Sequence, residues 1–396
     1  MRAHAVRRGA AVLALILAAC SGDAGGEGAL LVHDDAGSIA VVAADGTGRV
    51  EITGPAPPGR RHAQPTWSPD GSRVAWVDAG DDSSIHVVGI DGGEDRSAAV
   101  PAPMFYLAWA PAGDRIAGLG PSAEQGIALV LIEIGDEAFE AASIDGGLPY
   151  YFDWAPDGES LLVHVGDDVL AEVGLDGTRR TAGSGTPGPF PAPAWLEDGR
   201  QVYSVLGAVG QALVVAAGGD ETRVVDAAAG LVFDAAGDRI AFLAGAAAGP
   251  PGEAVSAALG LPVTAVPGSL GVVDAATGVQ WVITREPVLT FEWSPDGTRL
   301  LYLVGEEGGP ARWHVWDGER STGFAAFTPT TLMVRDYLRF FDQYARSQTA
   351  WSPDSSAFAY AGIGEGGRAG VWVQRLDLPA PRWVTEGEMV SWRPIR

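Results

Sequence analysis

Two acidic residues occupy the positions in this 396-residue chain that are best suited to chemistry. Asp153 and Glu292 each come directly before a tryptophan, in the similar segments Phe-Asp-Trp and Phe-Glu-Trp. Two carboxylates that face one channel can act as a general acid and a general base. The alternative, which we favour, is that both line a wet channel and accept hydrogen bonds from backbone N–H groups.

A second group of candidate residues is basic. Arg60, Arg61 and His62 form the one concentrated positive spot of the sequence, in a segment that we expect to be a loop. Such a spot can bind an anion or an acidic partner, because guanidinium groups recognise carboxylates and phosphates. The simpler interpretation, that these residues order their own loop, is the one we favour.

Other kinds of chemistry lack the residues they need. The six histidines are scattered, with no HExxH motif and no pair four residues apart, so we expect no metal and no cofactor. The chain contains no lysine, which excludes Schiff-base catalysis and P-loop phosphate binding. A net charge of −24 argues against nucleic acid as a partner, since phosphate binding needs a basic surface.

The first twenty residues resemble a bacterial lipoprotein signal. Arg2, Arg7 and Arg8 precede an apolar run over residues 9–19, which is too short to span a bilayer. Leu17-Ala18-Ala19-Cys20 then resembles a lipobox, which implies cleavage after residue 19 and acylation of Cys20, for example with palmitate. We expect residues 20–28 to be a flexible tether. The resemblance implies a lipid-anchored protein outside the cytoplasm, on the outer membrane of a Gram-negative cell or otherwise on the outer face of the cell membrane.

The elements that must position these residues follow from an internal repeat. Segments of the type Trp-Ser-Pro-Asp-Gly recur at intervals near 40 residues, with a degenerate copy that we align at Phe233; they begin at Trp67, Trp109, Trp154, Trp195, Phe233, Trp293, Trp351 and Trp392. Pro-Asp-Gly favours a tight turn, and the run after each turn is rich in strand-forming residues. A period near 40 with short strands is typical of a β-propeller.

These repeats resemble the TolB-like, PD40 (WD40-like) family of β-propellers. The resemblance covers residues 29–396 and implies an all-β fold of four-stranded blades in one domain. Residues 29–53 provide three strands and residues 389–393 a fourth, so we expect the two ends of the chain to pair and complete an eighth blade. No Gly-x-Ser-x-Gly motif of a hydrolase domain is present.

Two repeats are longer than the others because of insertions at about 244–268 and 324–347. The second predicts a helix from Thr331 to Arg346, with an aromatic stripe facing the propeller and Arg335, Arg339 and Arg346 on the opposite side. This helix either plugs the channel mouth, which we favour, or docks a partner. Both insertions should decorate the same face of the ring, where binding loops usually lie.

The sequence therefore predicts a monomeric envelope lipoprotein whose propeller binds another envelope protein or a small ligand and is not catalytic. The alternative is a propeller enzyme, a lyase or a lactonase-like hydrolase, with its site at the channel mouth. A cluster of His, Arg and carboxylates in the channel would favour the enzyme, and an exposed apolar patch would favour the binding module.

Overall fold

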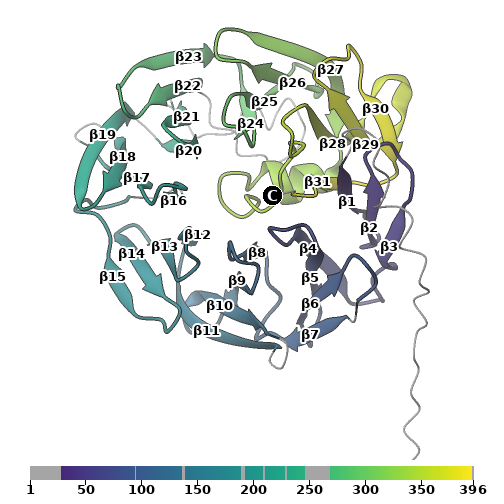
Figure 1. Cartoon of the computed structure of the whole chain (residues 1–396), viewed down its shortest axis with the longest axis horizontal. Coiled ribbons are helices and arrows are strands. Elements are labelled where there is room, and N and C mark those ends of the chain that lie inside the picture. The colour runs from purple at the N-terminus through teal and green to yellow at the C-terminus, as the bar shows by residue number, and fades with distance from the viewer. Residues whose placement is uncertain are drawn as a thin grey trace, which may run out of the picture.

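Antiparallel sheets surround a central axis, as in a β-propeller (Figure 1). The computed structural model describes residues 28–394 except residues 94, 136–138, 189–191, 208–209, 228–229 and 246–267. The predicted signal segment, Cys20 and most of the insertion at 244–268 therefore lie outside the described residues. Within these, 31 strands form six four-stranded sheets and one seven-stranded sheet.

Each four-stranded sheet has one strand beside the channel and three further out (Figure 1). Five of these sheets are continuous in sequence and consist of β4 (Arg61–Trp67), β5 (Arg73–Ala79), β6 (Ser84–Gly89) and β7 (Arg96–Ala99); β8 (Tyr106–Trp109), β9 (Arg115–Ser122), β10 (Gly126–Ile134) and β11 (Phe139–Gly147); β12 (Tyr150–Trp154), β13 (Ser160–Val165), β14 (Val169–Gly174) and β15 (Arg179–Thr181); β16 (Ala194–Trp195), β17 (Gln201–Leu206), β18 (Gln211–Ala217) and β19 (Asp220–Ala227); and β20 (Leu231–Ala236), β21 (Arg239–Gly245), β22 (Gly268–Asp274) and β23 (Gln280–Thr284).

The sixth four-stranded sheet joins the two ends of the chain. Its strands are β1 (Ala29–His33), β2 (Ile39–Ala43), β3 (Val50–Thr53) and β31 (Met389–Trp392). Strand β31 is antiparallel to β1, with Leu30 opposite Trp392 and His33 opposite Met389.

The seven-stranded sheet contains the strands on either side of the second insertion. They are β24 (Val288–Trp293), β25 (Leu300–Gly305), β26 (Ala311–Trp316), β27 (Ser321–Pro329), β28 (Ala357–Ile363), β29 (Ala369–Arg375) and β30 (Arg382–Thr385). Its two halves meet where Thr328 of β27 pairs with Ile363 of β28. A single bridge from Trp351 to Phe358 replaces a full strand on the channel side of β28.

The recurring turn explains why each first strand reverses direction where it does. In the copy at Trp67, Gly71 has a φ of +65°, which favours glycine. The Asp70 carboxylate accepts hydrogen bonds from the Ser68 hydroxyl and the Ser72 N–H, and the Ser68 bond is the main reason why its pKa falls to about 2. We call the face of the ring that carries these Pro-Asp-Gly turns the turn face.

Three of the recurring tryptophans connect adjacent sheets through a hydrogen bond, whereas the buried indole N–H groups of Trp67, Trp109, Trp195 and Trp392 make no such bond to a described residue. The indole N–H groups of Trp154, Trp293 and Trp351 donate to carbonyl oxygens of the preceding inner strand, at 3.0 to 3.2 Å, and the acceptors are Ala108, Asp234 and Glu292. The rings are at most 7% exposed, so each buries a large apolar surface between two sheets as well as making this bond.

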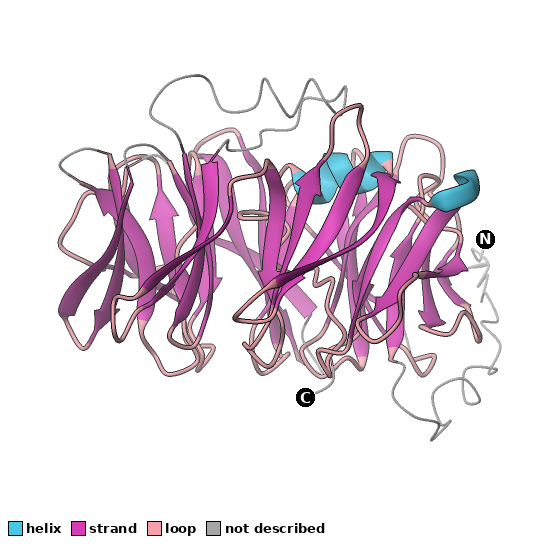
Figure 2. Ribbon diagram, turned by 90° about the horizontal axis from the view of Figure 1, so that it is seen from above, coloured by secondary structure: helices cyan, strands magenta, loops and turns pink. Residues whose placement is uncertain are grey.

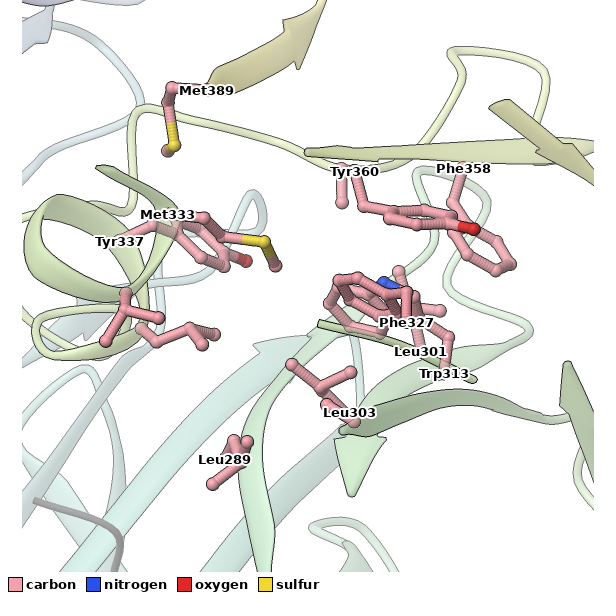
Figure 3. Packing of buried hydrophobic residues seen from close by; sticks show 14 of the residues in the cluster. Leu289, Leu301, Leu303, Trp313, Phe327, Met333, Tyr337, Phe358, Tyr360 and Met389 are labelled. Atoms are coloured by element: carbon pink, nitrogen blue, oxygen red, sulfur yellow. The ribbon is translucent and has the colours of Figure 1, made fainter. Parts of the chain in front are cut away.

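The predicted helix is shorter than the sequence indicated. Helical structure begins at Thr331 as predicted but ends at Leu338; Met333–Leu338 form the π-helix η2, and residues 339–344 continue as turns. Met333 and Tyr337 pack into an apolar cluster with Trp313, Phe327 and Met389, which fastens η2 to the seven-stranded sheet (Figure 3). The other helix is η3 (Glu365–Gly367), and neither described helix is long and apolar enough to cross a membrane.

Candidate functional site

One mouth of the channel is crossed by residues 330–348, which we call the strap. Helix η2 and the turns after it lie near the centre of the ring in Figure 1, and Figure 2 shows the helices on the edge opposite the C-terminus. The strap contacts inner strands all around the channel. Tyr344 donates its hydroxyl to the Tyr150 carbonyl at 3.2 Å and stacks on Tyr151, while Phe341 packs edge-on against Phe291.

Below the strap, the inner strands carry three carboxylates that each link two neighbouring sheets. The second oxygen of Asp153 accepts the Trp195 N–H at 2.7 Å, that of Asp234 accepts the Trp293 N–H at 2.9 Å, and that of Glu292 accepts the Ala350 N–H at 3.0 Å. The first oxygens bond the Trp154 N–H, the Ala235 N–H and the Thr349 hydroxyl. We call these contacts the acid bridges.

Asp234 is a channel acid that the sequence comparison missed. Phe233 had been aligned with the repeated tryptophan, which made Val232 the residue before the aromatic. The structure shows that Ala235 takes the place of the tryptophan, because Asp234 both accepts the Trp293 N–H and offers its carbonyl to the Trp293 ring. The pairs Phe152-Asp153, Phe233-Asp234 and Phe291-Glu292 are the signal that would have revealed it.

The acids line a cavity of about 890 Å³ inside the ring. Tyr337, Phe341 and Arg346 of the strap form one end of it. The opposite end is lined by turn residues, among them Glu197, Asp198, Asp238, Pro295 and Asp296. A second hollow of about 510 Å³ shares Asp153, Trp195, Glu197 and Arg346 with the first and reaches Pro69, Pro111 and Pro156. The channel is therefore covered by the strap and open on the turn face.

Burial governs the acid–base properties of the cavity. Desolvation raises the pKa of Glu292 to about 7, against the opposing effect of its bonds to Thr349 and Ala350. Desolvation also raises the pKa of Asp342, in the strap, to about 6, and it raises the pKa values of Asp153 and Asp234. The nearby Arg346 guanidinium lowers the pKa values of the three aspartates and so offsets part of the burial effect.

Arg346 faces the channel, and the expectation that it lies on the outer side of a helix is wrong. Its guanidinium donates to the carbonyl oxygen of Pro193 at 2.8 Å and to that of Phe233 at 3.4 Å, and it lies 5.8 Å from the Phe233 ring centre. The reason is that the helix ends at Leu338, so the helical spacing no longer sets the direction of residue 346. Arg335 and Arg339 are exposed as expected, and Arg335 forms an ion pair with Asp336.

The basic spot at Arg60, Arg61 and His62 is largely engaged within the protein. Arg60 forms an ion pair with Asp78 at 2.7 Å and also donates to the Asp82 carbonyl. His62 is buried, with its Nδ1 atom 2.8 Å from the Gly37 carbonyl oxygen. Arg61 is exposed at the first position of β4, so strand and loop share these three residues.

The hydrogen bonds hold the acids in fixed positions. Both oxygens of Asp153, and both of Glu292, accept one hydrogen bond from the protein, and each oxygen keeps a second lone pair. Within the described ranges, no three His, Cys, Asp or Glu side chains converge in a way that would hold a metal ion. Arg and carboxylates do converge, as the enzyme interpretation requires, but no histidine lines either hollow.

Comparison with known proteins supports the fold alone. No protein-family model and no curated protein matches the sequence. Solved structures do match. Dihydro-heme d1 dehydrogenase NirN matches with a TM-score of 0.59 and 13% identity, over 93% of this chain and 75% of that one. A eukaryotic initiation factor matches with a TM-score of 0.56 and 11% identity, over 94% of this chain and 100% of that one, and the C-terminal WD40 domain of Sif2 with a TM-score of 0.56 and 10% identity, over 87% of this chain and 92% of that one. The chain is an all-β protein of the β-propeller class.

Proposed function

We propose that this protein is a lipid-anchored binding module of the cell envelope, which recognises a ligand or another envelope protein at the open mouth of its channel. The observation that carries the proposal is the cavity of about 890 Å³, covered by the strap at one end and lined by turn residues at the other. A pocket of this size on a rigid scaffold is typical of ligand sites.

The proposed module is an eight-bladed ring. Six four-stranded sheets count as six blades, and the seven-stranded sheet counts as two, β24–β27 and β28–β30. Trp351 supports this count, because its bridge to Phe358 lies where the blade of β28–β30 needs an inner strand. Pairing of β31 with β1 supports closure of the ring through the two ends of the chain.

The strap offers a second surface for a partner. Arg335 and Arg339 are exposed on it against an acidic background, with a net charge of −24 for the whole chain. Replacing both arginines with glutamate would weaken the binding of an acidic partner to this surface. Since exposed substitutions usually shift stability by less than about 0.5 kcal/mol, the melting temperature should hardly change.

Photo-crosslinking in the cells that make the protein tests which mouth is used. A photoreactive residue replaces Asp238 at the open mouth, Arg339 on the strap, or Asp226 on the outer strand β19 as the control. We expect a specific adduct when the photoreactive residue stands at Asp238 and none when it stands at Asp226. A small-molecule ligand of the open mouth should co-purify with the protein and be detected by native mass spectrometry. Capture from Arg339 alone would move the site to the strap. The enzyme alternative would gain support if a captured small molecule were chemically changed and the Glu292→Gln variant left it intact.

A further inference from the structure

An organic cation from the protein's own chain, the Arg346 guanidinium, already lies in the cavity. The Arg346 guanidinium reaches from the strap to two backbone carbonyls, those of Pro193 and Phe233, and approaches the Phe233 ring. Carbonyl oxygens and an aromatic face are the neutral groups that recognise guanidinium and ammonium ions. Arg346 therefore shows, from within the fold, which chemical group this cavity accommodates.

The acidic side chains that line the cavity outnumber its two cations, which are Arg346 and Arg239. Asp153, Asp234, Glu292 and Asp342 all line it together with Arg346. The acid bridges fix three of these carboxylates in place with hydrogen bonds, but hydrogen bonds from neutral N–H and O–H groups add no positive charge. At low dielectric, an added cation would gain more from these carboxylates than it would in water.

The shape of the cavity also suits a further cation. Aromatic rings of Trp195, Phe291, Trp293 and Phe341 line its wall, and such rings attract cations through their faces. Asp198, Asp238 and Asp296 stand at the open mouth, where Arg200 forms ion pairs with the first two and Arg299 with the third. Glu197 and Asp274 add further acidic charge there, which raises the local concentration of positive ligands. A volume of about 890 Å³ leaves room for a ligand beside the Arg346 side chain.

We propose that the cavity binds an alkylammonium or guanidinium group that enters from the turn face and settles beside Arg346. This inference rests on the proposed function of the cavity as a binding site and names its ligand class. The group can belong to a small polyamine or to an arginine side chain of a partner, and the two sources share the same recognition chemistry.

Calorimetric titration of the full chain at pH 7.5 and constant ionic strength tests this proposal. The probes are spermidine and an end-blocked Ala-Arg-Ala peptide, with succinate as the anionic control. We expect binding of at least one cationic probe and none of succinate. Tighter binding of spermidine would identify a polyamine site, and tighter binding of the peptide would identify a site for a protein partner.

Two substitutions should change the affinity in opposite directions. Asp342→Asn, outside the acid bridges, should weaken cation binding about tenfold, as loss of one partly buried charge implies, and Arg346→Met should strengthen it. Asp226→Asn on the outer strand is the control and should leave it unchanged. Absence of binding by both cationic probes, or equal affinity of the wild type and Asp342→Asn, would overturn the proposal. Capture of another ligand from Asp238 in the crosslinking experiment would still support the proposed function.

Discussion

Asp153, Asp234 and Glu292 use their carboxylates to connect sheets rather than to present free oxygens to solvent. Asp153 and Asp234 each accept one bond from their own strand and one from the next inner strand. Both donors of Glu292, Thr349 and Ala350, come directly after the strap. Because both carboxylate oxygens accept hydrogen bonds, these residues should matter first for stability and for the electrostatic field of the cavity.

Removal of one acid bridge should destabilise the protein. Asp234→Ala would leave the N–H groups of Ala235 and Trp293 without their acceptor, and a buried donor without a partner costs about 1–3 kcal/mol. We expect a lower midpoint in urea denaturation. The matched control is Asp220→Ala at the exposed start of β19, which should leave the midpoint unchanged. An Asp234→Ala midpoint equal to that of the control would show that the bridge adds no stability.

Glu292 should make stability depend on pH. Its pKa is raised from 4.5 to about 7, so the folded protein keeps a proton that the unfolded chain has already lost. The resulting stability is complete below pH 4.5 and is lost as the pH rises through 7, by about 2 kcal/mol between pH 5.5 and pH 8. Asp342 acts in the same direction.

Melting curves at pH 5.5 and pH 8 measure this effect. The wild type should melt at a lower temperature at pH 8, and the difference should shrink in Glu292→Gln, which stays neutral and can still bond Thr349 and Ala350. An undiminished difference in that variant would assign the pH dependence to other groups.

The sequence located two of the three acids of the bridges but could not reveal what they do. Asp153 and Glu292 stood out because a tryptophan follows each of them. Asp234 is followed by alanine, and the nearby Phe233 drew the alignment away from it. The acceptor role depends on contacts between sheets, which no local sequence pattern encodes. Asp153 and Trp195, for example, are 42 residues apart in the chain.

At the scale of elements, the two strands at the ends of the chain should be the most sensitive part of the ring. Deletion of residues 387–396 would remove β31, expose the edge of β1 and uncover the apolar side chains that pack against Trp392. We expect a loss of several kcal/mol, on the order of half the ~5–15 kcal/mol of a typical domain, together with aggregation through the open edge. Thermal melting and light scattering measure both effects. A truncated protein that melts like the full chain would show that β31 is not needed to hold the ring together.

The strands were more predictable from the sequence than the strap. Pro-Asp-Gly turns and strand-forming runs are local signals, and they mark most sheets at the right places. The amphipathic spacing of residues 331–346 indicated one long helix, yet η2 ends at Leu338. The turns after it bring Tyr344 and Arg346 to backbone carbonyls on the far side of the channel. These tertiary hydrogen bonds stabilise the fold more than further helical turns would. Pairing of β27 with β28 likewise joins strands that flank an insertion and follows from no local pattern.

At the scale of the whole molecule, the net charge of −24 would oppose contact with an anionic membrane. We predict that acylation of Cys20 keeps the protein there, since two acyl chains give stable anchoring. A Cys20→Ser variant should appear in the soluble fraction after cell lysis, and the wild type should stay with the membranes. Equal membrane association of both forms would rule out the lipid anchor.

The place where the chain joins the ring determines how such an anchor would orient the molecule. The Ala29 carbonyl accepts the Arg393 N–H at 2.8 Å, and Gly71 of a Pro-Asp-Gly turn lies against Arg393 and Pro394, so the first strand begins on the turn face. The nine residues from 20 to 28 can span at most about 30 Å. Anchored at Cys20, the propeller would direct its open mouth at the bilayer and its strap away from it. Ligands would then have to arrive through the narrow gap above the lipid surface, which favours partners embedded in the same membrane over solutes from the bulk.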